Sequence, residues 1–163
     1  MFDNMMFDKK LIDSVGQKFK DNNQSIAIAE SVTGGLLQAA FSNAAEASLF
    51  FQGGITTYNL GQKCRHLLVE PLHAMEYNCV SEKIAQEMSK NVCDLFLSDY
   101  GIGITGYAAK MPEKNINELF AYYAIALKNE IIECGKITST AEEGLATQLS
   151  YIHIVLKKLD SIL

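Results

Sequence analysis

Apolar residues recur at intervals of three and four positions in three long stretches of the chain. This spacing predicts amphipathic helices over residues 7–21, about 82–98 and 145–159. The apolar positions are Phe7, Leu11, Ile12, Val15 and Phe19, then Ile84, Met88, Val92 and Phe96, and finally Leu145, Leu149, Ile152, Leu156 and Leu159. Each stripe needs a partner surface, so all three helices are expected to cover one common core.

Short apolar runs between these helices predict the strands of a sheet. Gly53 and Gly54 interrupt the second run and indicate a bulge or a close approach of another backbone. The last two runs are separated by Lys128-Asn129-Glu130, which predicts a hairpin. The expected strands are around Ile26 and Ile28, Phe50–Tyr58, Tyr100–Gly106, Leu119–Leu127 and Ile131–Ile137.

The order of these elements predicts an α/β protein. A helix from Thr33 to about Asn43 follows the first strand, and short helical pieces end near Leu68 and begin at Pro71. The chain of 163 residues is long enough for one domain with a proper core and too short for two of ordinary size. We therefore expect a single domain, 1–163, folded as an α/β/α sandwich with a mixed parallel and antiparallel sheet.

Composition and charge exclude several classes of protein. The formal net charge of −5 opposes broad nucleic-acid binding, which requires a basic face. Acidic residues lie among the apolar ones in segment 1–8, which is unlike a signal peptide, and no apolar run approaches the length of a membrane span. The four cysteines form no Cys-x-x-Cys pair, and we expect reduced thiols in a cytoplasmic protein without a metal centre or cofactor.

The turn between the first strand and the following helix is the first candidate for chemistry. Ser31 lies there, beside the unpaired N–H groups of a helix start, which suit an anion or a developing oxyanion. Gly34 and Gly35 would let a ligand approach the backbone closely. Serine and threonine are also common helix caps, so the turn alone leaves both interpretations open.

The string Ala29-Glu30-Ser31-Val32-Thr33-Gly34-Gly35-Leu36-Leu37 resembles the opening signature of the C-terminal domain of the CinA (competence/damage-inducible) family. Further matches lie at the family's spacing, and the resemblance runs from about residue 10 to 130. They are Ser48 and Phe51, Gly54, Thr57-Tyr58, Lys63, Val80-Ser81-Glu82, Thr105-Gly106 and Pro112-Glu113-Lys114. The chain is similar to the stand-alone form of this domain.

The resemblance implies an activity and a set of site residues. Active members hydrolyse nicotinamide mononucleotide to nicotinate mononucleotide and ammonia, without a metal, by a serine–lysine mechanism. On matching positions Lys63 is the base, Ser31 or Ser48 the nucleophile, and Tyr58 orients the lysine or the substrate. The implied substrate-binding residues are Glu30, Thr33, Gly34, Gly35, Thr105 and Gly106. The implied partner is a small nucleotide, with neither nucleic acid nor membrane, and a homo-oligomer is expected.

Residue chemistry allows this mechanism only under one condition. A serine hydroxyl needs a base to take its proton, and a lysine serves as that base only when burial or a neighbouring cation lowers its pKa. Lys63 stands in a polar turn, where a solvated lysine is the commoner case. The sequence therefore predicts that Ser31 and Lys63 come within hydrogen-bond reach of each other if the chain is an enzyme.

Two departures from the family pattern favour a second hypothesis. A glycine-rich loop is replaced by Gly106-Tyr107-Ala108-Ala109-Lys110-Met111, so Tyr107 and Met111 are expected to fill space that a substrate would use. The two arginines near the start of the last helix are missing from segment 139–148, which carries Glu142 and Glu143 instead. These changes oppose a phosphate-bearing ligand. A catalytically silent relative that serves as a binding or assembly module is the alternative.

Overall fold

The computed structural model describes residues 6–163, and all bounds below refer to that part of the chain. The expectation about an export signal falls partly on residues 1–5, which lie outside the described residues. The helices are α1 (Lys9–Asp21), α2 (Leu36–Ser42), α3 (Leu60–Leu67), α4 (Pro71–Glu76), α5 (Glu82–Phe96) and α6 (Leu145–Ile162), with 3-10 turns η1 (Ala47–Leu49) and η2 (Pro112–Lys114). The strands are β1 (Ile26–Glu30), β2 (Phe51–Thr56), β3 (Tyr100–Gly106), β4 (Leu119–Leu127) and β5 (Glu130–Ser139).

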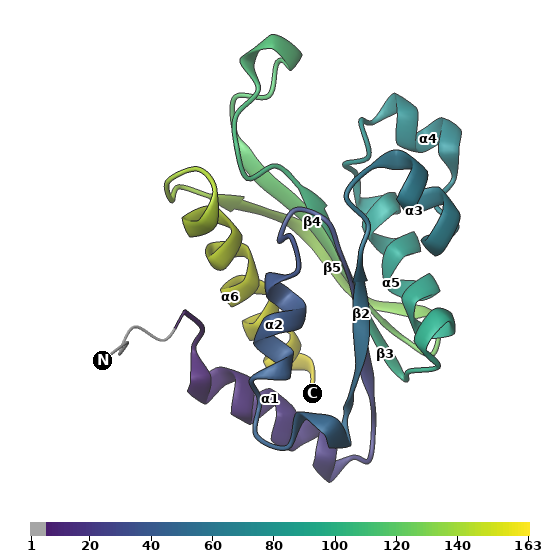
Figure 1. The fold of residues 1–163 in the computed structure, drawn as a ribbon, viewed down its shortest axis with the longest axis vertical. Helices are drawn as coiled ribbons and strands as arrows, with labels where there is room; N and C mark the ends of the chain where they lie inside the picture. The colour runs from purple at the N-terminus through teal and green to yellow at the C-terminus, as the bar shows by residue number, and fades with distance from the viewer. Residues whose placement is uncertain (1–5) are drawn as a thin grey trace.

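The strands form one mixed sheet in the order β2-β1-β3-β4-β5. β1 pairs in parallel with both β2 and β3, while β4 is antiparallel to β3 and to β5. The connections explain this pattern, because helices carry the chain back between the parallel strands and a tight turn joins β4 to β5 (Figure 1). The expected α/β fold with a mixed sheet is confirmed.

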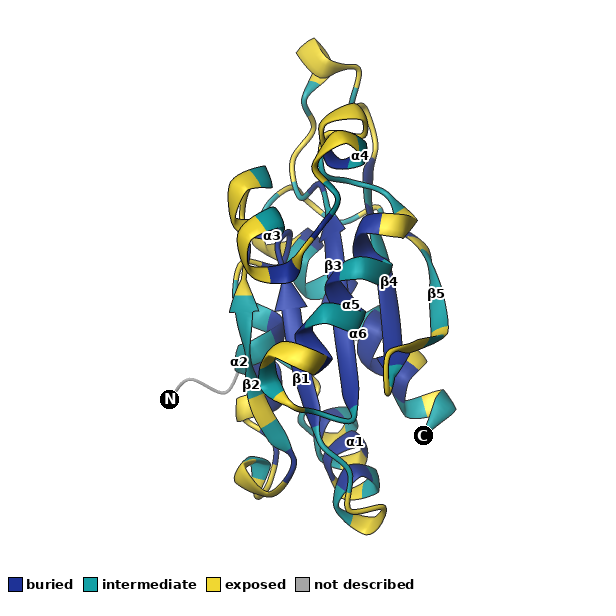
Figure 2. Ribbon diagram, turned by 90° about the vertical axis from the view of Figure 1, so that its right-hand side faces the viewer, coloured by how far each residue is buried: buried dark blue, intermediate teal, exposed yellow. Residues whose placement is uncertain are grey.

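Helices cover both faces of the sheet, and the alternation of side chains along each strand gives each face its own core. Ile26 and Ile28 of β1 belong to the cluster shared with α1, α2 and α6. Ala27 and Ala29 belong to a smaller cluster with α3 and α5. Figure 2 shows the central strands buried between these two layers. The C-terminal end of β1 can therefore present neighbouring residues to opposite layers.

Several element boundaries differ by a few residues from those predicted. The helix expected from Thr33 begins at Leu36, because Gly34 and Gly35 have positive φ values of 61° and 101° and form a turn first. The last strand covers residues 130–139 rather than 131–137. The predicted irregularity near Gly53 is confirmed, since the β1–β2 register shifts there and Gly53 has a φ of 113°.

Glycines of β3 allow close packing against α5. A Cβ atom at Gly101 would lie 2.1 Å from the carbonyl oxygen of Ser89, and one at Gly103 would lie 2.2 Å from that of Ala85. No side chain fits at such distances. The glycines of β3 therefore bring a helix close to the sheet.

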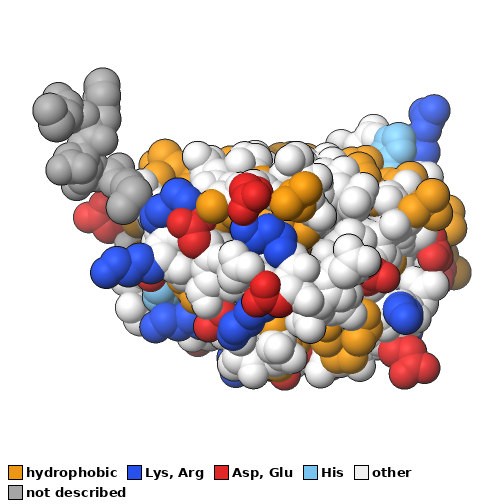
Figure 3. Space-filling model, turned by 90° about the horizontal axis from the view of Figure 1, so that it is seen from below, with side chains coloured by type: hydrophobic (Ala, Val, Ile, Leu, Met, Phe, Trp, Pro, Cys, Tyr) orange, Lys and Arg blue, Asp and Glu red, His pale blue; other side chains and the backbone are white. Residues whose placement is uncertain are grey.

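Charges are interspersed on the face seen in Figure 3, where Lys and Arg side chains lie beside acidic ones. Ion pairs of Lys9 with Asp13, Lys18 with Asp160 and Lys20 with Glu46 involve α1 and its neighbours. Among residues 6–163, none of the helices has the length and apolar character needed to cross a membrane.

Candidate active site

Glu30 and Ser31 stand at the C-terminal end of β1 and project to opposite layers. Glu30 continues the face of Ile26 and Ile28 and reaches α2, whereas Ser31 continues the face of Ala27 and Ala29. The Ser31 N–H donates to the carbonyl of Ile104 at 3.1 Å, which holds the residue against β3. Ser31 therefore faces the layer that contains α3.

Lys63 of α3 meets Ser31 directly. Its Nζ lies 2.9 Å from Ser31 Oγ and donates to the carbonyl oxygen of Thr57 at 2.8 Å. Asn59 caps α3 by accepting from the N–H of Gln62, and this places Lys63 one turn into the helix. The predicted approach of Ser31 and Lys63 within hydrogen-bond reach is confirmed.

The surroundings of Lys63 favour its neutral form. Only 1% of the residue is exposed, although its sequence neighbours are polar. Burial lowers the pKa of Lys63 below its ordinary value, and only the partial influence of the Cys79 and Cys64 thiols opposes this. A neutral amine beside a serine hydroxyl can accept its proton, which is the condition that the chemistry requires.

The Glu30 carboxylate occupies the N-terminus of α2. One oxygen accepts from Thr33 Oγ1 at 2.6 Å and from the N–H groups of Gly35 and Leu37 at 3.0 Å, and the other accepts from the N–H of Gln38 at 2.8 Å. Four donors thus hold a buried charge and satisfy the helix start. The expectation that Glu30 and Thr33 contact substrate is not supported by this geometry, because their side chains bond each other.

The N–H groups expected to form a cradle at Gly34 and Gly35 already have acceptors within the protein. The N–H of Gly34 donates to the carbonyl of Ser31, and that of Gly35 donates to Glu30. Within residues 6–163, the N–H groups of Val32 and Thr33 have no such acceptor. Thr33 is 0% exposed, so of these two donors the N–H of Val32, directly after Ser31, is the candidate for holding an oxyanion.

Thr105 and Gly106 end β3 next to the Ser31 turn. Thr105 follows Gly101 and Gly103 on the α5 face, and its hydroxyl donates to the carbonyl of Cys79 at 2.7 Å. This bond ties the segment after α4 to the sheet. Gly106 packs against β4, since a Cβ there would lie 2.5 Å from the Cα of Ala121, and its role as a substrate-binding residue stays a prediction.

Tyr58 and Ser48 are not brought to Lys63 within this chain. Tyr58 is 78% exposed, and the acceptor that orients Lys63 is instead the backbone of Thr57. Ser48 lies in η1, before the start of β2, whereas Ser31 follows the end of the parallel strand β1. The two serines therefore lie at opposite ends of the adjacent parallel strands β1 and β2, and only Ser31 has the lysine as a partner.

Gln148 of α6 is a contact that the sequence analysis did not anticipate. Its Nε2 donates to the carbonyl oxygen of Val32 at 2.9 Å and therefore holds the Ser31–Gly35 turn from the last helix. Tyr107, expected to fill the site, instead accepts at its hydroxyl from Asn78 and at its carbonyl from the Tyr151 hydroxyl. None of these contacts places Tyr107 between Ser31 and Lys63.

Comparison with known proteins identifies this arrangement. The family profile described as "CinA C-terminal domain" matches residues 8–160. The chain belongs to the CinA C-terminal domain family. The resemblance seen in the sequence is thereby confirmed, and its extent includes the segment 131–160 that carried no motif match.

CinA relatives agree in sequence and in structure. A protein of Natranaerobius thermophilus described as competence-damage inducible is 37% identical over 107 residues, which are 66% of this chain and 26% of that protein. One of Streptococcus pneumoniae is 40% identical over 94 residues, covering 58% and 22%. The chain thus spans about a quarter of the length of the curated relatives that it matches.

Solved CinA structures match almost the whole chain. The crystal structure of a CinA superfamily protein from Klebsiella pneumoniae is 25% identical, with a TM-score of 0.87 over 94% of this chain and 95% of that one. One from Escherichia coli is 24% identical, with a TM-score of 0.88 over 100% and 94%. The CinA fold therefore accounts for both layers of the sandwich described above.

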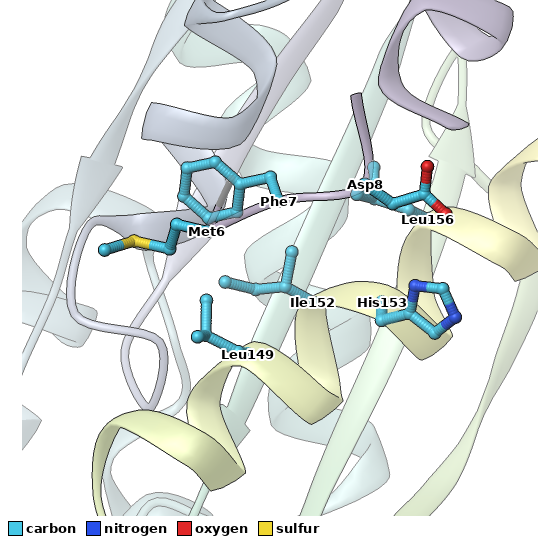
Figure 4. Close-up of a pocket in the computed structure, with 7 residues that line it drawn as sticks. All are labelled: Met6, Phe7, Asp8, Leu149, Ile152, His153 and Leu156. Carbon is cyan, nitrogen blue, oxygen red and sulfur yellow. The ribbon is translucent and has the colours of Figure 1, made fainter. Parts of the chain in front are cut away.

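Cavities elsewhere on this CinA domain do not include the Ser31–Lys63 pair. Met6 and Phe7 lie over Leu149 and Ile152 of α6 and enclose a cavity of about 70 Å³ (Figure 4). A second, of about 420 Å³, lies between segment 110–119 and the end of β5. Neither is lined by Ser31 or Lys63. The candidate site is the pair at the C-terminal end of β1, which the contact between Lys63 Nζ and Ser31 Oγ defines.

Proposed function

We propose that this CinA domain is an amidohydrolase in which Ser31 is the nucleophile and Lys63 the general base. The observation that carries the proposal is the 2.9 Å distance between Lys63 Nζ and Ser31 Oγ, with the amine buried. A lysine that served only solubility would not be held in an apolar layer. The resemblance to nicotinamide-nucleotide amidohydrolases supports nicotinamide mononucleotide as the substrate.

The reaction begins with proton transfer. Lys63 takes the Ser31 proton while Oγ attacks the carboxamide carbon, and the carbonyl electron pair moves onto oxygen. The N–H of Val32, which has no acceptor among the described residues, is the donor proposed for that oxyanion. The Lys63 ammonium then protonates the leaving nitrogen, which departs as ammonia.

The second half of the reaction reverses these roles. The acyl group is now an ester on Ser31, and Lys63 is neutral again. Water attacks the ester carbon while Lys63 accepts a proton from the water, and return of a proton to Oγ releases the carboxylate. The same amine thus serves as base and acid in both halves, so one buried group is sufficient.

The test is release of ammonia from nicotinamide mononucleotide by the purified chain. We expect turnover that Ser31→Ala and Lys63→Ala abolish and that a metal chelator leaves unchanged. Glu130→Gln, a change at an exposed acidic residue of the β4–β5 turn, is the matched control and should retain turnover. No ammonia release at high enzyme concentration, with the fold intact by circular dichroism, would contradict the proposal.

The silent-relative hypothesis is the second candidate, and one observation favours it. The side chain from α6 that contacts the catalytic turn is the neutral amide of Gln148, and the carboxylates of Glu142 and Glu143 precede it. A phosphate near this helix start would find no arginine. Comparing nicotinamide mononucleotide with nicotinamide riboside, which lacks the phosphate, separates a weakened phosphate site from an absence of catalysis.

A further inference from the structure

The Thr57 hydroxyl is a buried polar group that lacks a hydrogen-bond partner. Among the described residues, Thr57 Oγ1 is the one fully buried side-chain oxygen or nitrogen without a hydrogen-bond partner. The residue as a whole is 0% exposed. A buried hydroxyl left unpaired costs stability, so its retention requires an explanation.

The location of Thr57 indicates which group this hydroxyl serves. Its N–H donates to the carbonyl of Glu30 and its own carbonyl accepts from Lys63 Nζ, so the residue is fixed between β1 and the lysine. Thr57 directly follows β2, and its hydrogen bond to Glu30 continues the pairing with β1. Its side chain therefore lies on the same face as that of Ile55, which packs in the α3 and α5 layer. Ser31 and Lys63 lie in that same layer.

Thr57 is 0% exposed, so its hydroxyl has no contact with bulk water. Its partner is therefore expected among the groups packed around it. Rotation about χ1 is the single freedom that a threonine side chain retains when its backbone is fixed, and it redirects Oγ1 between staggered positions. Lys63 Nζ already donates to the Thr57 carbonyl. Its number of N–H donors changes when it takes up a proton in the proposed reaction.

Proton transfer changes what Lys63 needs. Lys63 Nζ donates to Ser31 Oγ and to the Thr57 carbonyl, which uses both N–H donors of a neutral amine, whereas the ammonium carries three N–H donors. Ser31 Oγ and the Thr57 carbonyl accept two of them. A buried ammonium with an unpaired donor is strongly disfavoured, so the third donor needs an acceptor at that moment.

We propose that Thr57 is a positioning residue whose hydroxyl accepts the third hydrogen bond of the Lys63 ammonium. The inference rests on the proposed function. The hydroxyl is unpaired in the resting site and paired in the charged intermediate, so its interaction is strongest where the reaction needs it. The unpaired hydroxyl lowers the stability of the fold while Lys63 is neutral, and it stabilises Lys63 once that residue is protonated.

The test measures the pKa of Lys63 itself, by NMR titration of protein labelled with ¹³C at the lysine ε carbon. Thr57→Val removes the hydroxyl and keeps the shape of the side chain, and we expect it to lower the pKa of Lys63 by about one pH unit. Thr57→Ser keeps the hydroxyl and should leave that pKa unchanged. Thr56→Val alters the neighbouring threonine, whose hydroxyl accepts from Gln38, and is the matched control.

Two further readouts distinguish a positioning role from a structural one. The acidic limb of the kcat/KM profile should shift in Thr57→Val by the same amount as the NMR pKa, and melting should occur at an equal or higher temperature than in the wild type. If the wild type has no turnover, the proposed function fails but the NMR comparison still decides the inference. A Lys63 pKa that is unchanged in Thr57→Val overturns it. If this variant does not fold, Thr57→Ala takes its place under the same criterion.

Discussion

Glu30 and Ser31 are neighbours in the chain, yet their side chains serve opposite faces of the sheet. Glu30 holds the start of α2 through hydrogen bonds to three backbone N–H groups and a threonine hydroxyl. Ser31 meets Lys63 on the other face. Because side chains alternate along a strand, a single residue step separates the side chain that caps α2 from the one that contacts Lys63.

Glu30→Gln should destabilise the fold. An amide keeps one acceptor oxygen but places an NH₂ group where the N–H groups of α2 need an acceptor, and it removes a negative charge from the helix start. We expect the free energy of unfolding to fall by about 2 kcal/mol, measured by urea denaturation. Glu143→Gln, at an exposed acid, should change it little, and an equal loss in both variants would contradict the role assigned to Glu30.

Ser31→Ala and Ser48→Ala should separate the two candidate nucleophiles. Only Ser31 lies beside Lys63, so its loss should reduce kcat by at least about a thousandfold. Ser48 lies at the opposite end of the parallel strands, and the kcat of Ser48→Ala should stay within about threefold of the wild-type value. Ammonia release measured in parallel decides between them. Equal loss in the two variants would place Ser48 in the site through another copy of the chain.

Lys63 should make stability depend on pH in a defined direction. Burial lowers its pKa from the ordinary 10.5, so between the lowered pKa and 10.5 the unfolded chain binds one more proton than the folded chain. The free energy of unfolding therefore rises with pH across that window, and the cost is largest below the lowered pKa. Lys63→Met removes the effect. We expect the stability of the wild type relative to Lys63→Met to increase as the pH rises toward 10.5, as measured by thermal melts in a series of buffers.

Gly103→Ala should break the contact between β3 and α5. The added Cβ would lie 2.2 Å from the carbonyl of Ala85, and neither backbone can move without disturbing the sheet. A loss of at least about 3 kcal/mol in the free energy of unfolding is expected. Gly61→Ala is the control, because its Cβ would lie at 3.6 Å from Asn59 Oδ1, an ordinary contact, in helix α3. That variant should be neutral or more stable by up to about 1 kcal/mol.

The fold could be predicted from sequence because its signals are local. Periodic apolar positions located the long helices, and short apolar runs located the strands. The link between Ser31 and Lys63 was also expected, but only through the family resemblance, since a lysine in a polar segment carries no sign that it will be buried. Folding α3 against the sheet is what places it in the core.

The remaining features depended on contacts that leave no pattern in sequence. The signature alone does not show that the Glu30 carboxylate accepts hydrogen bonds from the N–H groups at the start of α2. One of these is the Gly35 N–H, which we expected to be available to a ligand. Gln148 contacts Val32, which is 116 positions earlier in the chain. Ser48 matches a family position, yet it lies at the opposite end of the parallel strands from Ser31. Such long-range placement is set by the whole topology rather than by the residues on either side.

The hydrogen bond from Gln148 to the Val32 carbonyl also bears on the order in which the protein matures. During synthesis the segment that carries Ser31 leaves the ribosome before α6, the helix that carries Gln148, has been made. Nascent chains that end ahead of residue 148 would hold Ser31 on an unsupported turn. Under the proposed function, Ser31 would become competent only after the segment that carries Gln148 has been made and has packed against this turn.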